Sequence, residues 1–502
     1  MVQKYNNKIS RPDEKDGNKV QPEAVRILTD PDSWRTGTGS GSGHNNAPDP
    51  HSTDGLCLTD GNRVAVVGGG PAGTLFSRFL MRTLRRIGTH IELDIFEPRN
   101  FNYCGPAGCN HCGGVVSESL VQLLAADGII LPDETVQRGI DSYVMHMDVG
   151  SVRIDTPLQE KRIAAVYRGH GPKKSEQSHI TGFDHYLLRE AVRAGAHHRP
   201  HMVTSVDFDS GHPQIKLADG RKESYDLVVV ASGLNSALLG LVEQTGRGFS
   251  RPQMAKSFVA EFKLGAAAVE RHLGSSMNVF LLDLPHLQFA ALIPKGDYVT
   301  LVMLGDKVDE GLVNAFLNAE EVRRCFPDNR PPQNICQCLP RLNVTHARKP
   351  YADRVVFIGD SGVARLYKDG IGSAYRTAKA AANCVALYGY SERNFKEHYW
   401  PACRKIVFDN MIGKCVFGVC HLIQRLTFAR RGVLRMTEQE QYGAGVAPRM
   451  SSVLWDVFTG SAPYREVLLR TLHPVFISRL LWNLAAANLR LPSARKRGVT
   501  AS

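Results

Sequence analysis

The sequence contains no window of about 18 uninterrupted apolar residues, so we expect no helix that crosses a membrane. Its N-terminal stretch lacks the basic segment followed by an apolar core that marks a secretory signal peptide. Aromatic residues are scarce over roughly the first 55 positions, where Gly, Ser, Asp, Asn and Pro are frequent. Because such a composition buries too little apolar surface to fold, we expect residues 1–58 to be disordered.

The cysteines lack the pattern of a disulfide scaffold, since there are 11 of them, an odd number, in 502 residues. A reducing compartment therefore fits the chain better than an oxidising one. No nucleic-acid-binding motif is recognisable, and we expect no nucleic-acid partner. The length exceeds what one hydrophobic core usually supports, so two packed domains are expected.

A dinucleotide-binding fingerprint follows the first apolar run. Residues 63–68 predict a buried strand, residues 74–87 a helix, and residues 91–96 a second strand that ends at an acid. The turn before the helix has the pattern G-x-G-x-x-G, whose glycines permit a tight turn, close approach to a pyrophosphate and close helix packing. The helix N-terminus would attract the phosphates, and the acid would bind a ribose. The cofactor-binding candidates are Gly68, Gly70, Ala72, Gly73 and Glu97.

A second motif, nearly 300 residues later, favours FAD over NAD. Asp353–Ser361 predicts a strand that ends in Gly-Asp, and an Ala-rich helix is expected from about Gly370 to Leu387. The segment resembles the second FAD motif of glutathione-reductase-like flavoproteins. The resemblance implies that Asp360 binds the ribityl chain and that the helix N-terminus faces the N1/O2 edge of the flavin, where its dipole stabilises negative charge. Tyr225–Gly233 resembles the strand that closes the FAD domain in that class. The residues assigned to FAD here are Gly233, Gly359, Asp360, Gly370, Ile371, Gly372 and Ser373.

Two further segments resemble the geranylgeranyl reductase family. Between Arg162 and Leu187 an Arg is followed by Phe183-Asp184, similar to the family's R…FD..L…A pattern. Cys112–Ser117 is similar to its C-G-G-G-hydrophobic segment, which implies that Gly113 and Gly114 lie near the flavin.

The resemblance covers roughly residues 62–400 and implies an α/β fold. A Rossmann-like FAD-binding domain would be interleaved with an antiparallel-sheet substrate domain over residues 59–400, followed by a basic helical region over residues 401–502. The expected FAD-binding segments are about 60–150, 180–240 and 345–400, and the expected substrate-domain segments are about 150–180 and 240–345.

One strand departs from the family pattern. The family carries Y-x-W-x-F-P-K along its substrate cavity, whereas residues 289–295 here keep the Pro-Lys end and have Ala in place of the Trp. Losing that ring would open space beside the flavin. The related flavin halogenases carry W-x-W-x-I-P, of which only Ile-Pro remains, so we reject halogenation. The substrate-cavity candidates are Phe289, Ala291, Ile293 and Pro294.

Cys104, Cys109 and Cys112 have the spacing of the first three ligands of plant-type [2Fe–2S] proteins. The alternatives are an iron–sulfur cluster, a zinc site that needs distant Cys336 or Cys338, spare thiols, and a thiol beside the flavin. We expect Cys112 to be a flavin-proximal thiol, a candidate proton donor or disulfide partner, and we expect no metal site.

The family resemblance implies an FAD-dependent oxidoreductase that reduces isolated C=C bonds of a geranylgeranyl-type isoprenoid lipid. Hydride would come from the reduced flavin, and an acid would protonate the other carbon. An FAD-dependent monooxygenase of the hydroxylase type and a non-catalytic prenyl-binding protein are the alternatives. The electron donor, NADPH, NADH or ferredoxin, stays open.

The net charge of +12 is concentrated near the C-terminus, since residues from Pro401 onward carry 15 Lys and Arg against 5 Asp and Glu. Two apolar segments there, 406–423 and 468–482, are interleaved with basic residues and resemble amphipathic helices. They would either pack on the catalytic domain or contact a membrane peripherally. We expect a cytoplasmic protein, at the inner face of the membrane if these helices bind lipid.

Overall fold

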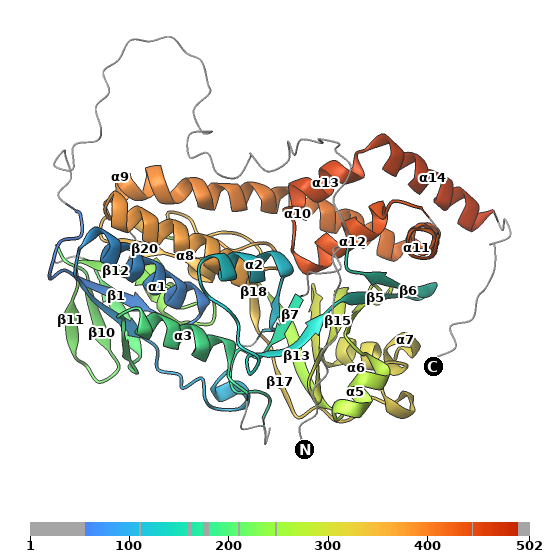
Figure 1. Cartoon of the computed structure of the whole chain (residues 1–502), viewed down its shortest axis with the longest axis horizontal. Coiled ribbons are helices and arrows are strands. Elements are labelled where there is room, and N and C mark those ends of the chain that lie inside the picture. Colours follow the sequence, from blue (N-terminus) through green and yellow to red (C-terminus); the bar gives the residue numbers. More distant parts are fainter. Residues whose placement is uncertain are drawn as a thin grey trace, which may run out of the picture. The chain divides into compact units, whose positions relative to one another are not determined.

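The computed structural model describes residues 56–109, 112–157, 163–173, 180–208, 211–245, 248–443 and 445–489. The prediction that residues 1–58 are disordered therefore concerns, apart from its last three positions, a segment outside the described residues. From Leu56 onward the described chain belongs to one compact unit, drawn in colour in Figure 1.

A mostly parallel sheet forms around the dinucleotide fingerprint, with the strand order β19-β20-β12-β1-β2-β8. Only β19, at the edge, runs antiparallel to its neighbour. β1 is central and its residues Val64, Ala65 and Val66 are fully buried, as expected for a parallel strand covered on both faces. The predicted strands are thus confirmed. Their bounds are β1 (Arg63–Val67), β2 (Glu92–Phe96), β8 (His197–Arg199), β12 (Leu227–Val230), β19 (Tyr351–Ala352) and β20 (Val355–Phe357).

Two helices position the cofactor motifs on this sheet. Helix α1 (Pro71–Ile87) begins three residues earlier than predicted, because Pro71 suits the first turn, where its missing N–H costs nothing. Helix α8 (Gly370–Leu387) has the predicted bounds and packs beside α1. Helix α3 (Phe183–Arg193) also packs against α1.

A larger, mostly antiparallel sheet has the order β17-β13-β16-β15-β14-β5-β6, with β18 paired to β13. Strands β13 to β18 of this sheet lie within residues 240–345, and β5 and β6 join them because β5 pairs with β14. The bounds are β5 (Ser142–Met147), β6 (Gly150–Asp155), β13 (Met254–Lys263), β14 (Ser276–Phe280), β15 (Leu287–Lys295), β16 (Tyr298–Gly305), β17 (Cys336–Cys338) and β18 (Arg341–Asn343).

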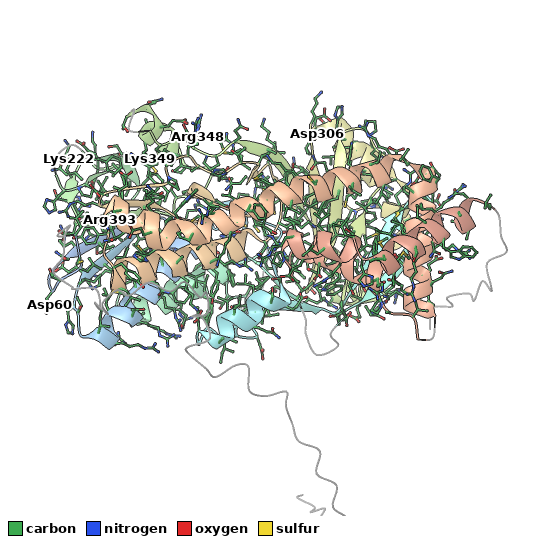
Figure 2. The ribbon with its side chains drawn as sticks, turned by 90° about the horizontal axis from the view of Figure 1, so that it is seen from above. Asp60, Lys222, Asp306, Arg348, Lys349 and Arg393 are labelled. Carbon is green, nitrogen blue, oxygen red and sulfur yellow. The ribbon has the colours of Figure 1, made fainter. Side chains whose placement is uncertain are left out.

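Two three-stranded sheets and several short helices complete this part of the fold. Charged side chains such as Lys222, Asp306 and Arg348 are exposed and point outward (Figure 2). The strand bounds are β3 (Val115–Val116), β4 (Val136–Ile140), β7 (Ile163–Val166), β9 (Val203–Asp207), β10 (Gln214–Leu217) and β11 (Lys222–Ser224). The helix bounds are α2 (Glu118–Ala126), α4 (Leu238–Gln244), α5 (Ala266–His272), α6 (Glu310–Asn318) and α7 (Glu320–Arg323).

The C-terminal region is helical, as predicted. Buried Arg365, just before α8, ties it to the FAD-type motif: its guanidinium donates to the backbone oxygens of Gly460 and Ala462 and lies 3.5 Å from the carboxylates of Asp369 and Asp409. The helices are α9 (Glu392–Asn394), α10 (Trp400–Arg425), α11 (Thr427–Tyr442), α12 (Arg449–Thr459), α13 (Tyr464–Thr471) and α14 (Pro474–Asn488).

One helical segment differs from the expectation that none could cross a membrane. Glu392–Arg425 spans 34 residues and includes a window of mean hydropathy 1.5, of which only 17% is buried. The expectation rested on the absence of an uninterrupted apolar run. This window is apolar on average although it includes Asp409 and Lys414. Asp409 is buried and accepts hydrogen bonds from the first N–H groups of α13, both at 3.0 Å, so one side of α10 packs on protein. Length and composition alone are weak evidence for a spanning helix.

Candidate active site

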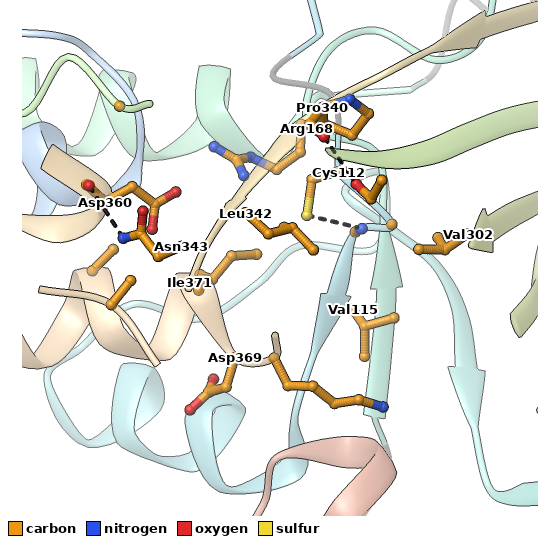
Figure 3. A pocket seen from close by; sticks show the side chains of 18 of the residues that line it. Cys112, Val115, Arg168, Val302, Pro340, Leu342, Asn343, Asp360, Asp369 and Ile371 are labelled. Carbon is orange, nitrogen blue, oxygen red and sulfur yellow. Dashed lines mark hydrogen bonds between the residues drawn. The ribbon is translucent and has the colours of Figure 1, made fainter. Parts of the chain in front are cut away.

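One cavity brings the two predicted cofactor motifs together with the face of the larger sheet (Figure 3). Its walls come from the ends of β1 and β12, the N-terminus of α8, the loop before β3, and strands β13 to β16. The predicted residues that line it are Gly68, Gly70, Ala72, Glu97, Cys112, Gly113, Gly114, Gly233, Phe289, Ala291, Ile293, Asp360, Gly370 and Ile371.

The close packing at the nucleotide end of the cavity requires glycine at two positions, Gly68 and Gly73. A Cβ on Gly68 would lie 2.4 Å from the Ala231 oxygen, and Gly68 has a φ of +113°. A Cβ on Gly73 would lie 2.0 Å from the Gly68 oxygen, so Gly73 serves helix–strand packing and does not line the cavity. The buried Glu97 carboxylate accepts hydrogen bonds from the backbone N–H of Gly69 at 3.0 Å and of Arg99 at 2.9 Å, which fix its orientation.

The second motif packs against the first at Gly359. A Cβ added to Gly359 would lie 2.7 Å from the Cβ of Ala72. Gly359 thus permits close packing and is not itself on the cavity wall. The Asp360 carboxylate faces the cavity, and among the described residues none donates a hydrogen bond to it. Burial raises the pKa of Asp360, and the charge of Arg168 opposes that rise.

The N-terminus of α8 is capped by its own preceding residue. The Asp369 carboxylate accepts a hydrogen bond from the Gly372 N–H at 3.1 Å, and the Ser373 hydroxyl donates to the Asp369 backbone oxygen at 3.0 Å. Gly372 and Ser373, which we assigned to FAD, therefore serve the cap and do not line the cavity. Gly370 and Ile371 do line it.

Strand alternation corrects one substrate-cavity assignment. Phe289, Ala291 and Ile293, which we assigned to the substrate cavity, line this cavity. Pro294 follows one position later, so its ring lies on the opposite face of β15 and does not reach the cavity.

The cysteine-containing loop lies against the same cavity. Cys112 Sγ accepts a hydrogen bond from the Gly114 N–H at 3.4 Å. A Cβ on Gly114, which has a φ of +65°, would lie 1.9 Å from the Val166 oxygen. Within the described part of the chain, no group of His, Cys, Asp and Glu is arranged to hold a metal ion.

The reductase-like segment forms a buried ion pair beside this loop. Arg168 Nε lies 2.5 Å from Asp184 Oδ1, and Arg168 Nη2 lies 2.9 Å from Asp184 Oδ2. Burial opposes the charge of Arg168, yet Asp184 outweighs burial and raises the pKa of the guanidinium. Arg168 lines the cavity, whereas Arg162 lies outside the described residues.

One cation on the wall, Lys368, was not anticipated from the sequence. Lys368 Nζ lies 4.1 Å from the centroid of the Phe289 ring and 4.5 Å from that of Phe458, and it donates to the Phe458 backbone oxygen at 3.0 Å. Burial lowers the pKa of Lys368 to about 7. Phe458 belongs to α12, so no local sequence pattern could have paired these residues.

Two unpartnered polar atoms also lie on the wall. Ser232 Oγ and Asn343 Oδ1 are buried and have no hydrogen-bond partner among the described residues. Figure 3 shows Asn343 beside Asp360, and its amide nitrogen donates to the Asp360 backbone oxygen at 3.2 Å. Such atoms fit a polar ligand in this cavity.

No protein-family model matches the chain, and no curated protein sequence does. A geranylgeranyl bacteriochlorophyll reductase-like protein of Thermoplasma acidophilum has a similar structure, with a TM-score of 0.60 and 13% identity over 82% of this chain and 99% of that one. Halogenase PltM in complex with phloroglucinol and FAD is also similar, with a TM-score of 0.54 and 13% identity over 86% of this chain and 93% of that one. A flavoprotein/dehydrogenase from Cytophaga hutchinsonii has a TM-score of 0.52 and 15% identity over 85% of this chain and 98% of that one.

At these identities the likeness concerns the fold. It agrees with the fold of the reductase-like resemblance, and the presence of halogenases among the similar structures means that the fold does not select the reaction. The chain has the fold of the FAD-dependent oxidoreductases.

Proposed function

We propose that the protein is an FAD-dependent enzyme that reduces C=C bonds of an isoprenoid, geranylgeranyl-type lipid. The observation that carries the proposal is a single cavity that joins a dinucleotide fingerprint, a free carboxylate at Asp360 and an apolar sheet face.

The residues present fit FAD. The turn at Gly68–Gly70 and the N-terminus of α1 would hold the pyrophosphate, because no side chain there obstructs it. Glu97 would bind the ribose, and Asp360 the ribityl hydroxyls. Ser232 and Asn343 offer further polar contacts. When bound and reduced, FAD supplies a hydride.

The substrate side of the cavity is apolar. An isolated alkene has no polar handle, so it must be positioned by packing in a site that excludes water. The sheet face and α12 supply that surface through Val259, Met277, Val279, Phe289, Ala291, Ile293, Val302, Leu304, Leu342 and Phe458.

Lys368 would supply the proton that the second alkene carbon needs. In its ammonium form, Lys368 donates one N–H to the backbone oxygen of Phe458. Its other N–H groups can donate to a ligand in the cavity. The rings of Phe289 and Phe458 stabilise the charged form, and burial favours release of the proton.

The experiment is anaerobic reduction of the purified protein, incubation with geranylgeranyl lipids and mass spectrometry. We expect bound FAD and products that gain two hydrogens for each reduced bond. Bound FAD with oxygen inserted in air would favour the monooxygenase. Lipid binding without FAD would favour the prenyl-binding protein.

We further infer peripheral binding to an anionic membrane, at its cytoplasmic face. Phe408, Met411, Val419 and Leu422 are spaced three, eight and three residues apart, so they share one face of α10, and each is more than half exposed. We call these four residues the α10 stripe.

Charge around the α10 stripe complements an anionic surface. Four exposed basic residues lie on the same helix: Arg404, Lys405, Lys414 and Arg425. Helix α14 adds exposed apolar side chains, with Leu481 at 61% and Trp482 at 64%. Apolar residues flanked by cations are typical of helices that lie in the membrane interface, and such contact would deliver a poorly soluble lipid to the enzyme.

A further inference from the structure

Cys112 lines two cavities. It lies on the wall of the cofactor cavity and also on that of a second cavity of about 40 Å³. Three other cysteines line the second cavity, namely Cys109 from the same loop and Cys336 and Cys338 from β17. The fold therefore brings together four thiols from two distant segments.

The register of the sheet explains why both β17 thiols face this cavity. Cys336 pairs with Glu261 and Cys338 with Val259 of β13, and all four residues line the cavity. Residues two apart on a strand point to the same face. Because β17 is the edge strand, the cysteine loop can lie against it without displacing another strand.

We propose that the second cavity is a thiol–disulfide site that accepts electrons from a dithiol reductant and delivers them, through Cys112, to the cofactor cavity. The inference rests on the proposed function for the cofactor itself. It assigns a chemical class, a dithiol, to the electron donor.

Three observations favour disulfide chemistry over a metal. Within the described residues, no group of His, Cys, Asp and Glu is arranged to hold a metal ion. Cys109 and Cys112 form a C-x-x-C pair, a spacing that supports reversible disulfides. The Arg168 guanidinium interacts electrostatically with both of them.

Cys338 would be the partner on the strand side. Burial raises the pKa of Cys338 to about 12, and the charge of Cys109 adds to this more than that of Cys112 does. Cys109 would exchange between Cys338, which lines the second cavity, and Cys112, which lines both cavities.

The exchange balances in electrons and protons. A dithiol attacks the S–S bond between Cys109 and Cys338, leaves as its own disulfide, and restores two cysteine thiols. Cys109 and Cys112 would then form an S–S bond and pass two electrons and one proton to the oxidised FAD proposed for the cofactor cavity, and the second proton would leave to solvent. Attack of Cys338 on Cys109 breaks that bond, frees Cys112 and completes the cycle.

The first test is disulfide mapping. The full-length protein, as purified with FAD, is treated with oxidised glutathione, alkylated, digested and analysed by mass spectrometry. We expect a disulfide between Cys109 and either Cys112 or Cys338. Absence of both bonds, or zinc or iron bound stoichiometrically to the purified protein, would overturn the proposal.

The second test follows the flavin absorbance anaerobically with dithiothreitol as the dithiol. We expect Cys112→Ser and Cys338→Ser to slow its bleaching by roughly tenfold or more, because each breaks the exchange chain. The exposed Cys57→Ser is the matched control and should bleach like the wild type. Equal rates in all four proteins would overturn the proposal. Dithionite should bleach every variant alike, which verifies that FAD is bound. A protein without FAD would contradict the proposed function, and the disulfide map would still decide this site.

Discussion

At the scale of single residues, burial gives Lys368 its chemical character. With a pKa of about 7, the side chain is an ammonium below that pH and a neutral amine above it. If the ammonium donates the proton, the wild-type rate should fall as the pH rises through about 7. Lys368→Met keeps the side-chain length and removes the proton, so kcat should fall by about 10²–10⁴-fold, with a smaller change in KM.

Rates measured across pH with saturating lipid check this expectation. The variant should also lose the decline near neutral pH. Exposed Lys263→Met, at the end of β13, is the control and should retain the wild-type profile. An unchanged profile in Lys368→Met would remove Lys368 from the mechanism.

Gly70 tests the nucleotide end of the cavity. Gly70 lines the cavity at the N-terminus of α1, so an indole in Gly70→Trp would occupy the proposed pyrophosphate site. We expect FAD binding to be abolished, as measured by flavin absorbance per protein after gel filtration. Gly418→Trp, with open space around it on exposed α10, should keep its FAD. Full FAD content in Gly70→Trp would show that the phosphates lie elsewhere.

At the scale of elements, a buried charge network fastens the C-terminal helices to the cofactor motif. Arg365 and Asp369 have side chains only 6% and 3% exposed, and the exposed fraction of Asp409 is 11%. Asp409 in turn caps α13. In Figure 1, α10, α12 and α13 lie close to one another next to the end of α8. The network therefore couples the start of α8 to α10 and to the end of α12, whose Phe458 and Thr459 line the cavity.

Arg365→Met should destabilise this junction by about 3–5 kcal/mol, because it removes the buried cation between Asp369 and Asp409. Asp369 would keep its ion pair with Arg376, at 2.8 Å. The expected result is a lower Tm, together with faster proteolysis after residue 400. Arg393→Ala breaks an exposed pair with Glu397 and should cost less than about 1 kcal/mol. Equal Tm values for these two variants would show that the network does not stabilise the packing of the C-terminal helices.

At the scale of the whole molecule, the charge distribution and the α10 stripe predict salt-sensitive membrane binding. Each cation near an anionic surface contributes roughly 1 kcal/mol, and salt screens that attraction. We expect flotation with anionic liposomes at low salt, less at high salt, and little with neutral liposomes.

Phe408→Ser combined with Leu422→Ser should reduce flotation, because it removes two exposed apolar side chains from the α10 stripe. Ile130→Ser, which alters a residue 74% exposed outside the C-terminal region, is the matched control. Equal absence of the wild type from the lipid fraction under every condition would contradict membrane binding. Self-association through the α10 stripe, seen as a dimer by light scattering, would assign that surface to a second copy.

Short segments of the chain encode the local units of this protein. Strand, glycine turn, helix and terminal acid around Gly68–Gly73, and the strand followed by α8, are encoded within short segments, because hydrophobic period and glycine freedom act over a few residues. The alternation of a strand, which lines the cavity with Phe289, Ala291 and Ile293, is equally local. Assigning Pro294 to the cavity ignored this alternation, because Pro294 directly follows Ile293 on the strand.

Contacts between residues far apart in the chain arise from the packing of whole elements. The pairing of Arg168 with Asp184, the enclosure of Lys368 by Phe458, and the convergence of Cys109 with Cys338 join separate segments of the chain. The pKa of Lys368 likewise depends on the packing of α12 over β15. Burial and electrostatic interaction depend on distance in space, so a pattern along the chain identifies the reactive residues of a fold but leaves their partners undetermined.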